Sequence, residues 1–192
     1  MRAATGAWDR ERPTEGAYAA LLTFADGTFA TLTYSGYGHF DSDEFMHWTS
    51  EMGLPKAPHK QASRPAFADS TRETALKYAR SYGGSAYEPP AAGDVAHQHF
   101  GMIVVSCEQA DLRPLPNGVM IYRNGSARLD PLPPPAIPRI EVIDEFYNAV
   151  VHGTAPLHDG AWAMATQEVL LAILRSARDG GDVHLHHQVG VR

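Results

Sequence analysis

The chain has 192 residues, of which 44% are hydrophobic, and it carries a net charge of −6. This length suits one domain with a substantial hydrophobic core. The acidic balance argues against nucleic acid as a partner, because nucleic-acid binding needs a basic surface. No apolar run approaches the roughly 20 residues of a membrane-spanning helix, so no membrane partner is expected.

The single cysteine, Cys107, allows no internal disulfide and fits a reducing compartment. Residues 1–12 lack the apolar core of a signal peptide, so a cytoplasmic location is expected. Three aliphatic residues at 103–105 predict a strand over residues 102–107. We expect the thiol to be buried in that strand and inert.

The N-terminal region predicts a β-hairpin. Its two strands, residues 17–26 and 28–37, meet at Asp26-Gly27, which is a strong signal for a tight turn. In the second strand apolar residues alternate with threonines, so one sheet face would be apolar and the other rich in threonine. A threonine-rich face is either solvated or contacts another polar sheet face.

The densest group of polar side chains follows this hairpin. Tyr37, His39, Asp41 and Asp43 are the candidate substrate-binding residues. His39, Asp41 and Asp43 alternate, so they would share one face of an extended segment, at a strand end where sites are often built. Tyr37 and His39 could donate hydrogen bonds to a polar or carboxylated ring, and His39 could add acid–base chemistry.

Two other interpretations of this group remain open. A metal could be bound by His39, Asp41 and Asp43, whose side chains are common metal ligands. Alternatively, the group is a solvated strand end followed by a short helix over residues 42–52, which Ser42 would cap. The sequence assigns no catalytic, cofactor-binding or metal-binding residue.

The middle of the chain, residues 53–95, is predicted to be a mobile insertion. Up to residue 93 it contains neither Val nor Ile, so little burial is available to offset the entropy cost of ordering it. Only residues 71–82 have helical spacing. Further strands are expected at residues 118–122 and 127–129, joined by the turn signal Asn124-Gly125.

The C-terminal region has the clearest element boundaries. Apolar residues at helical spacing predict a helix that starts at Pro138 and ends before Gly153. A second helix is predicted between the N-cap Asp159 and Gly180, and a closing strand at residues 183–189. Two histidine-rich stretches, residues 97–99 and 184–187, are interpreted as surface strands.

This succession of elements predicts an α+β fold. Strands joined by tight hairpins dominate the first two thirds, and the two firmest helices come late. We therefore expect an antiparallel-rich open β-sheet with helices packed on one face. The whole chain, residues 1–192, would form a single domain.

Two segments resemble a known family. They read GAYAALLTFADGTFATLTYSGYGHFDSDEFMHW (residues 16–48) and EVIDEFYNAVVHGTAPLHDGAWAMATQEVLLAILRSARDGGDVHL (residues 141–185). These two sequences are similar to the C-terminal domain of the glucose–fructose oxidoreductase/inositol dehydrogenase family. Within that family it resembles members related to 4,5-dihydroxyphthalate (phthalate dihydrodiol) dehydrogenase. The resemblance covers roughly residues 5–50 and 96–190.

The resemblance implies a nicotinamide-dependent dehydrogenase acting on a hydroxylated ring. The substrate would be a small molecule, either a dihydrodiol such as a dihydroxy-dihydrophthalate or a sugar or cyclitol. NAD or NADP would bind to an N-terminal dinucleotide-binding half, whose Gly-rich turn and Glu-Lys-Pro motif this sequence lacks. The chain alone is therefore expected to bind no NAD(P) and to be inactive.

The same resemblance implies a homo-oligomer, most simply a dimer formed through the sheet face. Two rival functions remain open. The chain could be a non-catalytic oligomerisation or binding module that uses the same sheet. It could also be a metal-dependent enzyme built on residues 39–47.

Overall fold

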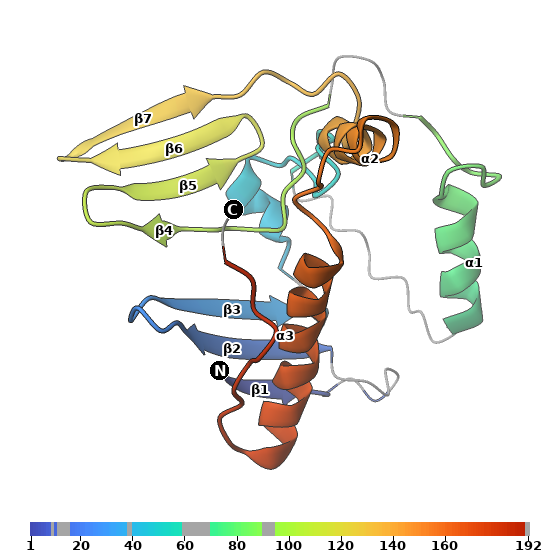
Figure 1. The fold of residues 1–192 in the computed structure, drawn as a ribbon. Coiled ribbons are helices and arrows are strands. Elements are labelled where there is room, and N and C mark those ends of the chain that lie inside the picture. Colours follow the sequence, from blue (N-terminus) through green and yellow to red (C-terminus); the bar gives the residue numbers. More distant parts are fainter. Residues whose placement is uncertain (9, 11–15, 38–39, 59–69, 90–94, 191–192) are drawn as a thin grey trace. The chain divides into compact units, whose positions relative to one another are not determined.

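The computed structural model describes residues 1–8, 10, 16–37, 40–58, 70–89 and 95–190, without the side chains of residues 70–73. These residues form two compact units. The first comprises residues 1–39 and 144–192, and the second comprises residues 40–143. Figure 1 shows the elements of each unit. The fold is α+β with antiparallel sheets, as the sequence predicts.

The first unit contains a three-stranded antiparallel sheet with the order β1-β2-β3. Its strands are β1 (Arg2–Gly6), β2 (Ala17–Thr23) and β3 (Phe29–Ser35). The predicted hairpin between β2 and β3 is confirmed. Its turn has Gly27 at φ 89°, and the backbone N–H of Thr28 donates to Asp26 Oδ1 at 2.9 Å. Strand β1 was not predicted, because its small residues give little strand signal.

The two faces of this sheet differ in chemistry, as the alternation in β3 predicts. One face carries Ala20, which is buried, and the stacked rings of Tyr18 and Tyr34. The opposite face carries Thr31 paired with Leu21 and Thr33 paired with Ala19, and all four side chains are exposed. We call this second face the open sheet face.

Helix α3 (Gly160–Asp179) packs on the first of these faces, against β1. Its ends follow the predicted signals. The carboxylate of Asp159 accepts the backbone N–H of Trp162 at 2.9 Å, and Gly180 takes the left-handed conformation at φ 63°. The buried side of the helix carries small residues and one isoleucine, which lets its axis approach the sheet.

Helix α2 (Ile140–His152) crosses from the second unit into the first. It begins two residues later than predicted, because Arg139 adopts a positive φ of 63° immediately before it. The helix ends, as predicted, before Gly153, which has φ 66°. None of the side chains of α2 is buried.

The predicted closing strand at residues 183–189 is wrong, since these residues form no strand. Other partners occupy their backbone amides. The amide of Val183 donates to the carbonyl of Met1 at 2.9 Å. The amides of His186 and His187 donate to the carboxylate of Glu168 at 2.7 and 2.9 Å. A side chain of α3 therefore holds the C-terminal segment where a strand partner was expected.

The second unit contains a four-stranded antiparallel sheet with the order β4-β5-β6-β7. Its strands are β4 (Val105–Ser106), β5 (Asp111–Leu115), β6 (Gly118–Arg123) and β7 (Ser126–Pro131). The hairpin at Asn124-Gly125 is confirmed, with φ values of 51° and 74°. Strand β5 was not expected.

Cys107 corrects a second expectation, because its side chain is exposed. The predicted strand over residues 102–107 shrinks to the two residues of β4, which pair only with β5 at the edge of the sheet. Met102, Ile103 and Val104 are exposed as well. The aliphatic residues at 103–105 indicated a buried strand. The short edge strand β4 has only one neighbouring strand, so these side chains and Cys107 remain exposed.

Two short helical elements complete this unit. The 3₁₀ helix η1 spans Ser42–Met46, and α1 spans Ser70–Arg80, close to the helix predicted at residues 71–82. The expected insertion at residues 53–95 includes α1, whereas its residues 59–69 and 90–94 lie outside the described part of the chain. Among the helices that are described, none is long and apolar enough to cross a membrane.

Candidate functional site

The candidate site is built on the turn that leads into η1. Asp41 caps this helix: its Oδ1 accepts the backbone N–H of Asp43 at 3.2 Å. The cap was predicted at Ser42, one residue later, and the helix was predicted to extend to residue 52. The observed helix has five residues and stops where His47 takes a positive φ of 54°. Met46, which is fully buried, fixes the helix to the interior of the unit.

A tight turn then brings the chain back beside η1. Thr49 and Pro55 form an isolated antiparallel bridge, and the amide of Ser50 donates to the carbonyl of Leu54 at 2.8 Å. The amide of Lys56 donates to the carbonyl of Trp48 at 2.8 Å. Lys56 is thereby returned to the neighbourhood of residues 41–43, although thirteen residues separate it from Asp43.

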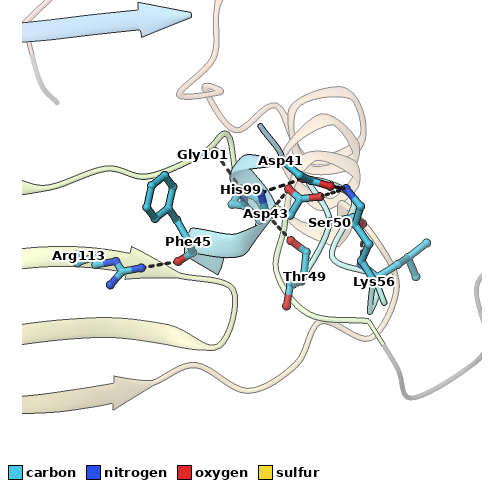
Figure 2. Close-up of polar contacts among 10 residues, drawn as sticks. Asp41, Asp43, Phe45, Thr49, Ser50, Lys56, His99, Gly101 and Arg113 are labelled. Carbon is cyan, nitrogen blue, oxygen red and sulfur yellow. Dashed lines mark hydrogen bonds and ion pairs between the residues drawn. The ribbon is translucent and has the colours of Figure 1, made fainter. Parts of the chain in front are cut away.

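The ammonium group of Lys56 lies between two carboxylates (Figure 2). Its Nζ donates to Asp43 Oδ2 at 2.9 Å and also forms an ion pair with Asp41. The side chains of Lys56, Asp41 and Asp43 are 30%, 23% and 14% exposed. The three groups are therefore shielded from bulk water but still reachable from it.

These ion pairs favour the charged forms of Asp41 and Lys56. The hydrogen bond from Lys56 lowers the pKa of Asp41 against the opposing effect of burial. Burial lowers the pKa of Lys56, but its hydrogen bonds to Asp41 and Asp43 outweigh that effect and leave the pKa raised. Neither Asp41 nor Lys56 is thus tuned for proton transfer near neutral pH.

His99 joins the same group from another part of the chain. Its side chain is 9% exposed, and its Nε2 lies 2.8 Å from the carbonyl oxygen of Thr49 and 3.8 Å from Asp43 Oδ1. The amide of Gly101 donates to Nδ1 at 3.1 Å. Nδ1 must therefore be the acceptor and Nε2 the protonated nitrogen, which is a neutral tautomer with both nitrogens satisfied.

We call Asp41, Asp43, Lys56 and His99 the Lys56 cluster. Lysine has three N–H donors, of which two are directed at the carboxylates, so one remains for a ligand. The carboxylate oxygens can accept hydrogen bonds from hydroxyl groups. The cluster can therefore orient the hydroxyl groups of a molecule, whereas its net negative charge disfavours direct contact with a carboxylate group.

The predicted substrate-binding residues fall into different places. Asp41 and Asp43 lie together in the cluster. Tyr37 is 4% exposed, and its ring packs against that of Trp8 with 4.8 Å between the centroids. His39 lies outside the described residues. Lys56 and His99 were not predicted as site residues, because nothing in the sequence indicates that residues 56 and 99 meet residue 43.

The histidines do not form the surface strands that the sequence suggested. The rings of His97 and His99 contact different partners, with His97 Nε2 lying 2.9 Å from the carbonyl oxygen of Pro133. Within the described residues, no group of three His, Cys, Asp or Glu side chains could hold a metal ion. Asp41 and Asp43, two of the metal ligands considered above, bind Lys56 instead.

The start of α3 does not fit a dinucleotide. A dinucleotide-binding turn presents glycine backbone and a positive helix N-terminus to the pyrophosphate. α3 begins instead at the carboxylate of Asp159, which would repel a phosphate.

Comparisons with known proteins show homology to a dehydrogenase. No family model matches the chain. It is 39% identical over 184 residues to the 1-carboxy-3-chloro-3,4-dihydroxycyclohexa-1,5-diene dehydrogenase of Comamonas testosteroni, covering 90% of this chain and 45% of that protein. This relative is called the Comamonas dehydrogenase below.

A solved structure supports the fold. The chain is similar to a protein of Bordetella bronchiseptica RB50 described as a candidate dehydrogenase, with a TM-score of 0.74 and 35% identity. The match covers 94% of this chain and 47% of that protein. The chain therefore spans about half the length of the relatives it matches.

Proposed function

We propose that this chain is the substrate-binding and oligomerisation half of an NAD(P)-dependent oxidoreductase. One observation carries the proposal, namely the 39% identity with the Comamonas dehydrogenase over 90% of the chain. The resemblance to the C-terminal domain of the glucose–fructose oxidoreductase/inositol dehydrogenase family points the same way. A non-catalytic binding module remains the rival function.

We propose a hydroxylated ring as the substrate. The name of the Comamonas dehydrogenase specifies a cyclohexadiene ring with two hydroxyl groups and a carboxyl group. A dihydrodiol of that kind, such as a dihydroxy-dihydrophthalate, presents hydroxyls that carboxylate oxygens and an ammonium group can bind. The partly exposed carboxylates of Asp41 and Asp43 suit this chemistry, and sugars or cyclitols are the wider class.

The substrate-facing residues in this proposal are His39, Asp41 and Asp43, whereas Tyr37, the fourth predicted residue, is buried against Trp8. The hydride would be carried by NAD or NADP, bound to the other half of the parent enzyme. In this half, the Lys56 cluster would orient the ring hydroxyls and displace water from them. The chain alone should then bind no dinucleotide and turn over no substrate.

We also propose that the chain forms a twofold dimer through the open sheet face. This face presents the exposed side chains of Ala19, Thr31 and Thr33 together with Leu21 and Phe29, on the side of the sheet away from α3. An open sheet face of this kind can meet its own copy, and twofold closure is the commonest arrangement of homo-oligomers.

A hybrid enzyme tests the proposed function. In it, this chain replaces the matched part of the Comamonas dehydrogenase, and NAD(P)H formation is followed with a dihydroxycyclohexadiene carboxylate as substrate. We expect turnover by the hybrid and none by either part alone. His39→Ala in the hybrid should lower kcat/KM at least tenfold, about 1.4 kcal/mol. A folded hybrid without activity would favour the binding module.

A further inference from the structure

Helix α3 carries apolar side chains on two opposite sides. One side carries Ala165, Ala172, Ile173 and Ser176, of which all four are buried. The other side carries Met164, Leu170, Leu171 and Leu174, each between 46% and 54% exposed, and the exposed Gln167 lies among them. These four residues lie within about 120° of one another around the helix axis, since successive residues turn by 100°. We call them the outer stripe of α3.

A stripe of this kind needs a cover. An ordinary surface helix is apolar on one side and polar on the other, so leucines on its outer side are an exception. The sheet of the first unit already occupies the inner side of α3. Three leucines and a methionine on the outer side therefore form an exposed apolar surface of the type that marks an interaction site.

The structure assigns the outer stripe of α3 as the surface on which the other half of the parent dehydrogenase docks. This inference rests on the proposed function. Its occupant follows from the comparisons, because the chain matches only 45% and 47% of its two relatives. In a protein of two domains, each domain covers part of the surface of the other, so apolar residues of that surface are exposed in one domain alone.

A second copy of the chain is the competing occupant, and the arrangement of the first unit argues against it. The open sheet face lies on the side of the sheet away from α3 and carries alanine and threonine side chains together with the exposed Leu21 and Phe29. Two surfaces on opposite sides of one unit suit two different partners, and the open sheet face already serves the proposed dimer.

Solvent accessibility of single cysteines tests this assignment. Cys107→Ser first removes the exposed native thiol. Leu171→Cys or Leu174→Cys is then placed in the isolated chain and in the hybrid with the Comamonas dehydrogenase. The rate of maleimide labelling is measured in both. Leu132→Cys, at a leucine with similar exposure of 49%, is the matched control.

We expect both stripe cysteines to react at least tenfold more slowly in the hybrid than in the isolated chain, while the control reacts at the same rate in both. Equal rates for the stripe cysteines would overturn the inference. Slow labelling of the isolated chain would also overturn it. If that protection grew with concentration, the cover would be a second copy; if it did not, the chain would cover its own stripe.

Turnover by the hybrid separates this inference from the proposed function. An active hybrid with unprotected stripe cysteines would leave the function standing and refute the docking surface. An inactive hybrid with protected stripe cysteines would establish the docking surface and count against the proposed reaction.

Discussion

The hydroxyl of Ser176 joins the end of a helix to the edge of a sheet. It is fully buried, accepts the backbone N–H of Ala3 at 2.8 Å and donates to the carbonyl of Gly181 at 2.7 Å. Strand β1 pairs with β2 on one side only, so its outward amide at Ala3 needs this partner. One small side chain thereby satisfies a strand amide and a carbonyl just beyond the end of α3.

Ser176→Ala should therefore destabilise the protein markedly. It leaves the amide of Ala3 and the carbonyl of Gly181 without their partner, which costs about 1–3 kcal/mol of the free energy of unfolding. Urea denaturation measures this change. Ser81→Ala is the control, because the exposed Ser81 hydroxyl only donates to the carbonyl of Lys77. We expect the control to change stability by less than about 0.5 kcal/mol, and equal effects would contradict the assigned role.

Lys56→Met should destabilise the cluster by leaving two carboxylates without their ammonium partner. We expect a loss of about 1–2 kcal/mol near neutral pH, since the groups are only partly buried. Arg128→Met is the control, because it removes an exposed ion pair of 3.8 Å with Asp130 and should cost little.

The difference in the free energy of unfolding between the wild-type protein and Lys56→Met should depend on pH, as the pKa shifts of Asp41 and Lys56 indicate. The hydrogen bond from Lys56 lowers the pKa of Asp41 below its ordinary 3.8. The stabilisation of the folded protein by charged Asp41 is therefore fully present above pH 3.8 and is lost as the pH falls through the lowered pKa. Burial opposes the charge of Lys56, but its carboxylate partners still raise its pKa above 10.5. The stabilisation of the folded protein by charged Lys56 is therefore lost as the pH rises through the raised pKa of Lys56. A difference independent of pH would contradict the ion-pair explanation.

At the scale of elements, Glu168 on α3 holds the C-terminal segment. Its carboxylate accepts the amides of His186 and His187 and the side-chain amide of Gln188, at 2.7, 2.9 and 3.1 Å. The amide of His186 is the main reason why the pKa of Glu168 falls from 4.5 to about 2. The negative charge of Glu168 is therefore tied to the docked position of the segment.

Glu168→Gln should loosen that segment without unfolding α3. The amide side chain retains one acceptor oxygen and loses the charge, so it cannot hold both backbone amides equally well. Hydrogen exchange at His186 and His187 should become faster, while exchange in β2 stays unchanged. The wild-type protein should show the same release as the pH falls from 4.5 towards 2, since a lowered pKa means that protonation favours release. Unchanged exchange in the variant would refute the role of Glu168.

At the scale of the whole molecule, the proposed dimer depends on the open sheet face. Thr33→Arg would bring like charges together across a twofold axis, so we expect light scattering to show a shift from dimer to monomer. Thr154→Arg, in the exposed loop after α2, is the control and should leave the mass unchanged. A monomer mass for the wild-type chain over a wide concentration range would contradict the dimer.

Elements with local signals were predictable from the sequence alone. The turn at Asp26-Gly27, the turn at Asn124-Gly125 and the boundaries of α3 all appear where the sequence places them. Their determinants are glycines that accept positive φ, a carboxylate that caps the helix start, and apolar residues at helical spacing. Each acts within a few residues along the chain, so no knowledge of the tertiary fold is needed.

Only the tertiary structure decided which residues meet across long stretches of chain. Asp43, Lys56 and His99 come together through hydrogen bonds between loops, and β1 forms because β2 pairs with it and Ser176 binds its outer edge. The same holds for the exposure of Cys107 and the lost strand at residues 183–189. Whether Cys107 is buried and whether residues 183–189 form a strand depends on the neighbouring segments, which supply a strand partner or a competing hydrogen-bond acceptor. Periodicity and composition do not encode these neighbours.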